Sequence, residues 1–151
     1  MSRVRFRLAI TFLVGAMAVV ACGNDTGQVT VTEVRIGQPT GPNAALYLTA
    51  SADGRSDRLV GATTEVARSV EIHESTMGED GTMGMSPVGA LELPEDGSLV
   101  LEPGGLHLML IDVERLEVGD VIEVALIWET SGEMTVGAQV VDPGDTMSHD
   151  G

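Results

Sequence analysis

Short alternating runs of apolar and polar residues, separated by turn signals, follow one another through most of this chain. For example, Val70 and Ile72 lie between polar neighbours in the sequence Ser-Val-Glu-Ile-His that ends at His73. Successive side chains on a β-strand point to opposite faces, so such a run predicts a strand with one apolar face. These runs recur at roughly 8–12-residue spacing without a long helical period, which predicts an antiparallel sandwich or barrel.

The turn and strand from Pro103 to Ile111 carry the most informative pattern. The Pro-Gly-Gly sequence at 103–105 predicts a turn, because Pro presets φ and Gly accepts positive φ. In the strand that follows, the leucines at 106, 108 and 110 share one face, and His107 and Met109 share the other. The strands predicted along the chain span residues 29–36, 44–52, 58–62, 69–73, 82–88, 99–101, 106–111, 121–129 and 134–141, and residues 115–119 form a turn or one helical turn.

Residues 1–21 predict a cleaved lipoprotein signal peptide. Three arginines precede an apolar run of 14 residues, 8–21, which is short for a membrane span of roughly 20 residues. The run ends in Val-Val-Ala before Cys22, as in a bacterial lipobox, where the thiol is acylated and anchors the protein. A simple signal peptide with an incidental cysteine is the alternative. Lipidation of Cys22 predicts an extracytoplasmic protein on a bacterial membrane, in the periplasm or on the outer face of the cell membrane.

Four segments follow from this organisation. Residues 1–21 are the signal peptide, 22–28 a lipidated tether, 29–141 the β-sandwich domain and 142–151 an acidic tail that we expect to be disordered. Hydrophobic residues make up 43% of the chain but aromatic residues only 3%, so the core must consist of Val, Leu, Ile, Ala and Met.

Charge and cysteine content exclude several functions. The formal net charge of −15, with arginine as the only basic residue type, disfavours binding to nucleic acid or to an anionic lipid surface. Cys22 is the single cysteine, so the mature domain has no internal disulfide, no cysteine nucleophile and no thiolate ligand. No arrangement of nucleophile, base and acid is recognisable either, so the sequence does not predict an enzyme.

Methionine and histidine supply the candidate chemistry. His73, Met85, His107 and Met109 offer two imidazoles and two thioethers that can converge at one end of a sandwich. Thioethers select Cu(I), whereas zinc sites favour Cys, His and carboxylate and a blue-copper site needs a thiolate. The ligand types therefore favour Cu(I) binding without electron transfer. Candidate auxiliary copper contacts are Met77, Met83, Met147 and His149. The alternative for each is an ordinary loop or tail residue without a role in metal binding.

The spacing of these four residues resembles the PCu(A)C family of periplasmic copper chaperones. That pattern is a His, a position often occupied by Met, ten residues, a Met, twenty-one residues and His-x-Met. Here His73, Glu74, Met85 and the 107–109 triplet fill it without a gap, and Glu74 departs from the commonest residue. The similarity extends over roughly residues 29–141.

The resemblance implies a cupredoxin-like, antiparallel Greek-key β-sandwich that binds one Cu(I) and is not an enzyme. It also implies copper delivery to the Cu(A) site of cytochrome c oxidase, with oxidase subunit II or another copper chaperone as partner. Two alternatives remain open: a copper-dependent oxidase or dismutase, which two thioethers disfavour, and a structural or adhesion lipoprotein whose sandwich merely contains methionine.

Overall fold

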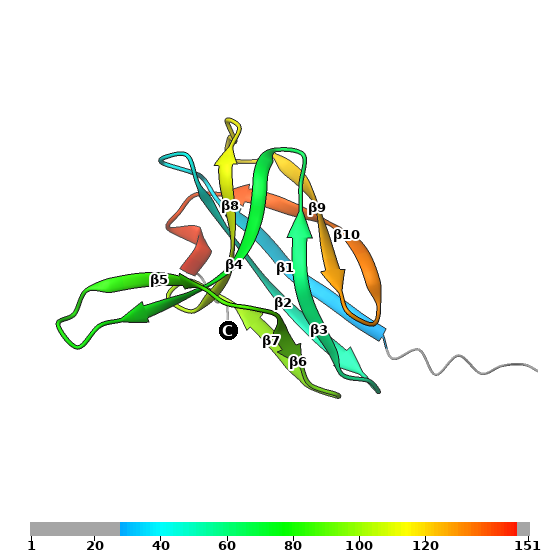
Figure 1. Cartoon of the computed structure of the whole chain (residues 1–151). Coiled ribbons are helices and arrows are strands. Elements are labelled where there is room, and N and C mark those ends of the chain that lie inside the picture. The colour runs from blue at the N-terminus through cyan, green and yellow to red at the C-terminus, as the bar shows by residue number, and fades with distance from the viewer. Residues whose placement is uncertain (1–27, 148–151) are drawn as a thin grey trace, which may run out of the picture.

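Short strands make up nearly the whole of the described part of the chain. The computed structural model describes residues 28–147, and its only helical element there is the 3-10 turn η1 (Asp145–Met147) (Figure 1). The strands are β1 (Gln28–Gly37), β2 (Ala44–Asp53), β3 (Asp57–Thr63), β4 (Ala67–Met77), β5 (Met83–Pro87), β6 (Leu91–Leu93), β7 (Ser98–Leu101), β8 (Leu106–Val113), β9 (Val121–Trp128) and β10 (Gly132–Val141). The all-β class that the alternating pattern predicts is confirmed.

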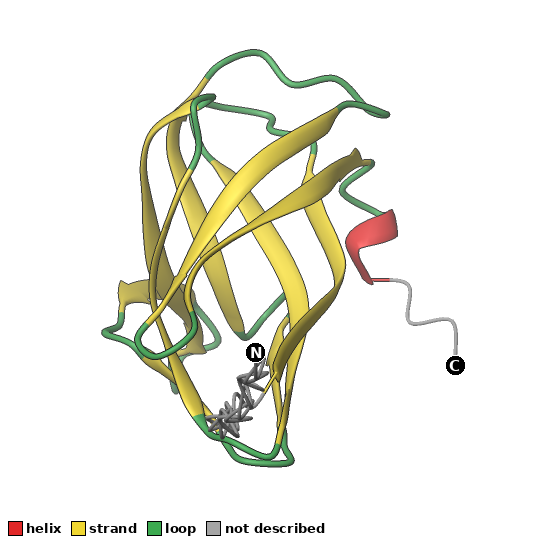
Figure 2. Cartoon of the chain, turned by 90° about the vertical axis from the view of Figure 1, so that its right-hand side faces the viewer, coloured by secondary structure: helices red, strands yellow, loops and turns green. Residues whose placement is uncertain are grey.

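These strands form one hydrogen-bonded sheet in the order β5-β4-β8-β2-β1-β10-β9-β3-β6, with β7 paired to β2. The sheet curls until β3 packs against β4, and the strands enclose a common interior (Figure 2). Among the described strands, β1 and β10 pair in parallel, whereas we expected antiparallel pairing throughout. A bulge with Glu33 at φ 55° interrupts the register of β1 and β2, and β10 pairs with the part of β1 that follows it.

Aliphatic side chains fill that interior. The inward positions of β2 alternate strictly, with Leu46 and Leu48 at no more than 1% exposure. The largest fully buried side chain is Trp128, which the low aromatic content had not led us to expect in the core. Met134 packs half-buried against this core. A core of this kind explains why the domain needs no disulfide.

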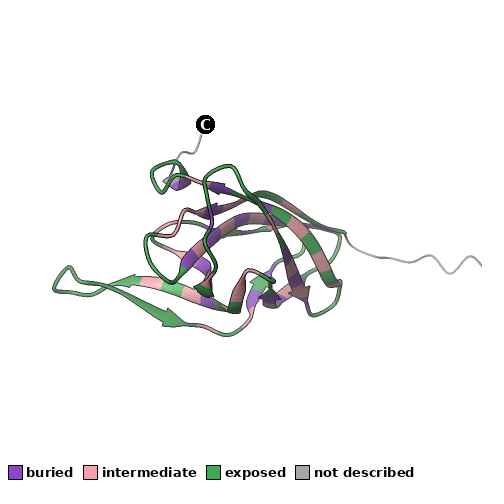
Figure 3. Ribbon diagram, turned by 90° about the horizontal axis from the view of Figure 1, so that it is seen from above, coloured by how far each residue is buried: buried purple, intermediate pink, exposed green. Residues whose placement is uncertain are grey.

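Two strand assignments from the sequence change in the structure. The short strand β6 was not predicted, although Leu91 and Leu93 alternate and are buried. β4 continues beyond His73 as far as Met77 and forms a hairpin with β5. This hairpin projects from the body of the sandwich, and its outer part is exposed (Figures 1 and 3).

The C-terminal segment requires a correction. We expected disorder from residue 142 onward, but residues 142–147 form a turn and η1, which packs against β1. Thr146 is buried, its hydroxyl donates to the carbonyl of Pro143, and its own carbonyl accepts from Nη2 of Arg35 at 3.0 Å. The local bond to Pro143 and the long-range bond from Arg35 hold a segment whose acidic composition alone predicts a solvated tail.

Candidate metal site

A tight turn positions the first candidate ligand. The amide of Gly105 donates to the carbonyl of Glu102 at 3.0 Å, with Pro103 next and Gly104 at φ 82°. This is the arrangement of a type II turn, which places Pro at its second position and a residue of positive φ at its third. The turn that the Pro-Gly-Gly sequence predicts is confirmed, and it feeds directly into β8.

The two faces of β8 differ as the alternation predicts. Leu108 and Leu110 are fully buried in the core, while Met109 is half-buried on the opposite face. His107 lies on the Met109 face but is only 3% exposed. The imidazole is covered by the neighbouring rings of Tyr47 and His73.

His73 and His107 lie directly opposite each other on paired strands. The register of β4 and β8 makes them cross-strand partners, and their ring centroids are 5.9 Å apart. Tyr47 covers His107 from β2, with its ring centroid at 6.3 Å. Imidazole nitrogens bind metals at about 2 Å, so two rings at this separation are close enough to share one ion.

Each imidazole has one engaged nitrogen and one free nitrogen. His73 donates from Nε2 to the carboxylate of Glu71 at 2.9 Å, and His107 donates from Nδ1 to the carbonyl of Gly105 at 3.2 Å. These bonds select the tautomers and leave a lone pair on His73 Nδ1 and on His107 Nε2. Both of these atoms are buried and have no hydrogen-bond partner among the described residues.

Unpaired buried nitrogens of this kind are uncommon, since a buried polar atom without a partner costs about 1–3 kcal/mol. Four such side-chain atoms occur within residues 28–147, and these two imidazoles supply half of them. The others are Nε1 of Trp128, which can only donate, and Nε of Arg58, which lies 2.6 Å from Glu92. Only the two histidine nitrogens can act as ligands.

Burial also keeps His107 in the form that binds metal. Desolvation lowers the pKa of its imidazole, the hydrogen bond to Gly105 acts in the opposite direction, and the nearby His73 lowers the pKa further. The net shift is downward, so the ring is neutral at neutral pH. A metal can then bind without first displacing a proton.

The candidate thioethers flank His73 on the same face of the sheet. Met109 is the cross-strand partner of Glu71, which precedes His73 by two positions. Met85 is the partner of Ser75, which follows His73 by two positions, and it is 58% exposed. Residues two apart or directly paired share a face, so both sulfurs lie diagonal to His73. The structure thus brings the imidazoles and Met109 together on β4 and β8 and places Met85 on the hairpin, midway between its tip and His73.

The remaining predicted residues lie farther away or outside the described range. Met77 and Met83 pair with each other at the outer end of the hairpin. Met147 is the last residue of η1, and Cys22 and His149 lie outside residues 28–147. Within the described range, no helix is long and apolar enough to cross a membrane.

Oxygen and nitrogen ligands alone do not account for a metal site. Within residues 28–147 no group of three or more His, Cys, Asp or Glu side chains could hold a metal ion. The strand register places the thioethers of Met109 and Met85 on the face of His73 and His107. Thioethers are soft donors, which suit a soft ion better than zinc or a hard cation.

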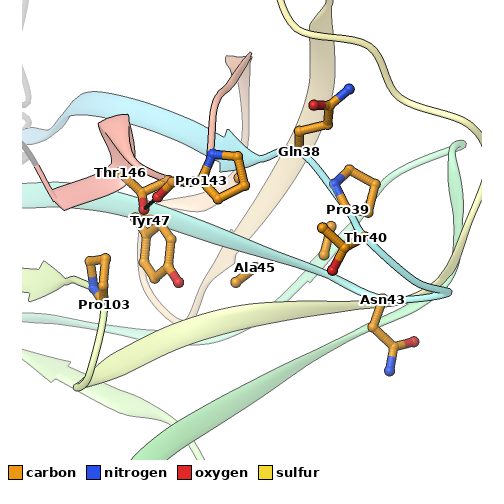
Figure 4. A pocket seen from close by; sticks show the side chains of 11 residues that line it. Gln38, Pro39, Thr40, Asn43, Ala45, Tyr47, Pro103, Pro143 and Thr146 are labelled. Carbon is orange, nitrogen blue, oxygen red and sulfur yellow. Dashed lines mark hydrogen bonds between the residues drawn. The ribbon is translucent and has the colours of Figure 1, made fainter.

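Three residues of this site were missed at the sequence level: Glu71, Gly105 and Tyr47. Glu71 could have been found, because period two places it on the face of His73. Tyr47 could not, because its contact with His107 depends on the pairing of β2 with β8. Its ring also lines a cavity of about 300 Å³ between β2, Pro103 and the C-terminal segment with Pro143 and Thr146 (Figure 4).

The fold and this face define a class of protein: a PCuAC-type β-sandwich domain with imidazole and thioether side chains on one face of the sheet. The chain is similar to a copper-bound PCuAC domain from PmoF2, with a TM-score of 0.65 and 28% identity over 78% of this chain and 95% of that one. It is similar to apo-DR1885 from Deinococcus radiodurans, with a TM-score of 0.58 and 26% identity over 94% and 97% of the two chains. The CuI-DR1885 structure matches at a TM-score of 0.55 and 27% identity over 85% of this chain and 86% of that one.

Residues 28–140 match the family model described as "Putative lipoprotein LpqE-like", and the chain belongs to this family. It is also 31% identical, over 56% of its length, to "Putative lipoprotein Lxx21020" from Leifsonia xyli subsp. xyli (strain CTCB07). The match covers 51% of that relative, so the chain spans about half the length of the curated relative it matches. The resemblance to PCu(A)C domains that the His and Met spacing indicates is confirmed.

Proposed function

We propose that this protein is an extracytoplasmic, lipid-anchored Cu(I) carrier that holds one ion with His73, His107, Met109 and Met85. The observation that carries the proposal is the facing pair of imidazoles, each with one nitrogen hydrogen-bonded to the protein and one buried nitrogen left without a partner among the described residues. An unliganded structural histidine gains nothing from this arrangement. A ligand does, because its tautomer and orientation are set before the metal arrives.

The donor set supports Cu(I) as the cargo. The set consists of two neutral imidazoles and two soft thioethers. It includes no carboxylate or thiolate, which would favour zinc, and no thiolate for a blue-copper centre. The similar structures from PmoF2 and Deinococcus radiodurans carry "Copper-bound" and "CuI" in their names, which supports the same metal here. Met109 and Met85 supply sulfur ligands from both sides of His73, on the same face of the sheet.

Exposure of one ligand supports a carrier rather than an enzyme. His107 is buried, whereas Met85 is more than half exposed and can leave the ion without disturbing the core. We infer that a partner approaches from the Met85 side and that copper passes to it by exchange of ligands. Oxidase subunit II, at the Cu(A) site of cytochrome c oxidase, or a second copper chaperone is the partner that the PCu(A)C resemblance favours.

The proposed location depends on Cys22. Acylation of this thiol after removal of residues 1–21 would anchor the domain on the outer side of a bacterial membrane through the tether 22–28. The LpqE-like family and the relative from Leifsonia xyli are both named as lipoproteins, which supports the anchor. The Cys22→Ala variant should leave the membrane fraction while retaining its copper affinity.

Anaerobic competition titration against a chromophoric Cu(I) chelator tests the proposal. We expect one Cu(I) per protein and no displacement by an equal concentration of Zn(II). A protein that binds no Cu(I), or that exchanges it for Zn(II), would contradict the assignment. Met134→Leu, a change remote from the site, is the matched control and should titrate like the unchanged protein.

A further inference from the structure

Three methionines line one face of the β4–β5 hairpin. Met85 belongs to the site described above, whereas Met77 and Met83 lie outside it. Met77 and Met83 are direct cross-strand partners, and Met85 lies two positions after Met83 and therefore on the same face. Their exposures are 72%, 66% and 58%. We define these three residues as the methionine arm.

Packing does not explain the methionine arm. Every residue of β5 is exposed, and none of the three methionines belongs to the core or packs against it. An exposed thioether contributes little to folding, whereas three on one face form a set of soft donors. Met134 illustrates the ordinary role, since it packs half-buried against the core.

The hairpin that carries these side chains is well defined by hydrogen bonds. At its tip the amide of Gly78 donates to the carbonyl of Thr82 at 2.7 Å, and Gly81 adopts φ 78°. The hydroxyl and amide of Thr82 both donate to Asp80, at 2.6 and 3.1 Å. The cross-strand pair Met77–Met83 is therefore held close to the turn that aligns it.

The same face leads without interruption to the imidazoles of His73 and His107. From the tip inward, the paired positions are Met77 with Met83, Ser75 with Met85, and His73 with Pro87, and His73 then pairs with His107. We propose that the methionine arm is a second Cu(I) position, a landing site on which the ion arrives before it reaches the imidazoles. This inference rests on the proposed function of the imidazole site and adds the route by which that site is filled.

The transfer step is a ligand exchange without redox change. Cu(I) bound to the sulfurs of Met77, Met83 and Met85 gains bonds to His73 Nδ1, His107 Nε2 and the Met109 sulfur as the bonds to Met77 and Met83 break. Met85 keeps its bond throughout, since it lies between the two positions.

Two measurements test the landing site. The first uses the His73→Ala/His107→Ala variant labelled with 13C at the methionine methyl groups and titrated with Ag(I), a redox-inert soft ion. We expect the first equivalent to shift the methyl signals of Met77, Met83 and Met85 and to leave Met134 in place. Unchanged Met77 and Met83 signals would overturn the inference.

The second measurement needs no change in the buried site. In the Met77→Leu/Met83→Leu variant, the equilibrium Cu(I) affinity should stay within about twofold of that of the unchanged protein. The rate of Cu(I) uptake from a Cu(I)–chelator complex should fall about tenfold or more, because only soft donors of the methionine arm are lost. Met134→Leu should alter neither quantity. Uptake at the unchanged rate would overturn the landing site and leave the proposed function standing. An unchanged protein that binds no Cu(I) would instead refute the proposed function.

Discussion

Two buried polar sites of this domain differ in how completely their hydrogen bonds are satisfied. Asp57, at the start of β3, is 5% exposed and accepts four hydrogen bonds. They come from the amides of Arg58, Thr130 and Ser131 at 2.7, 2.9 and 2.9 Å, and from the hydroxyl of Ser131 at 2.6 Å. Burial alone would raise the pKa of Asp57, but these bonds outweigh it and the pKa is lowered.

The hydrogen bonds of the imidazole pair are only partly satisfied. His73 and His107 each make one hydrogen bond and leave one buried nitrogen without a partner. Asp57 joins β3 to the β9–β10 turn, so its bonds stabilise the fold. The open nitrogens of His73 and His107 form no hydrogen bond with another described residue, so they add no such bond to the fold. The contrast separates a carboxylate with satisfied hydrogen bonds from a pair of imidazoles that we propose to bind a metal ion.

The largest effect should come from removing the satisfied carboxylate. Asp57→Ala leaves several partly buried donors unpaired and should lower the free energy of unfolding by about 3 kcal/mol. Urea denaturation measures this, with the exposed Asp53→Ala as the matched control. A loss below that of the control would show that Asp57 is not a structural anchor.

The opposite result should follow when one open imidazole is replaced. His107→Leu fills a similar volume, removes the unpaired nitrogen and leaves the Gly105 carbonyl still bonded to the amide of Ser75. The metal-free variant should therefore be at least as stable as the unchanged protein, while Cu(I) affinity falls by about 100-fold or more. Denaturation and chelator competition measure both quantities. A destabilised variant with intact copper affinity would reverse the assignment.

Loss of the carboxylate behind His73 should have a smaller effect. Glu71→Ala removes the acceptor for His73 Nε2, so the tautomer and orientation of the His73 ring are no longer fixed. The Cu(I) affinity should therefore fall about 10- to 100-fold. Glu71→Gln retains an acceptor oxygen and should recover part of that loss. Glu74→Ala is the control, because Glu74 is exposed on the opposite face. Equal affinity of the Glu71→Ala and Glu74→Ala variants would contradict a positioning role.

The smallest effect concerns the pH dependence of stability without metal. The pKa of His107 is lower in the folded protein than in the unfolded chain, so acidification protonates the unfolded chain first. Stability should decline as the pH falls from about 6.5 through the folded-state pKa of His107. Thermal unfolding between pH 7.5 and 5 measures the slope, and His107→Leu should reduce it. Identical slopes in the two proteins would exclude His107 as the cause.

Local patterns in the sequence determined much of this molecule. Strand positions, the turn at 103–105 and the opposite faces of Leu108 and Met109 follow from period two and from the backbone preferences of Pro and Gly. These rules act between neighbours along the chain and need no tertiary information. The spacing of His73, Met85, His107 and Met109 likewise indicated the PCu(A)C-type fold before any strand pairing was known.

Only the tertiary structure decided how these residues meet. Period two places His73 and His107 on strand faces, but the register of β4 against β8 makes them partners, and that register depends on packing between distant segments. The same is true of Tyr47 over His107, of the parallel pairing of β1 with β10 and of the Arg35 bonds that hold residues 142–147. The unpaired nitrogens of the two imidazoles can also be recognised only in the tertiary structure, because whether a buried atom lacks a hydrogen-bond partner depends on every element that surrounds it.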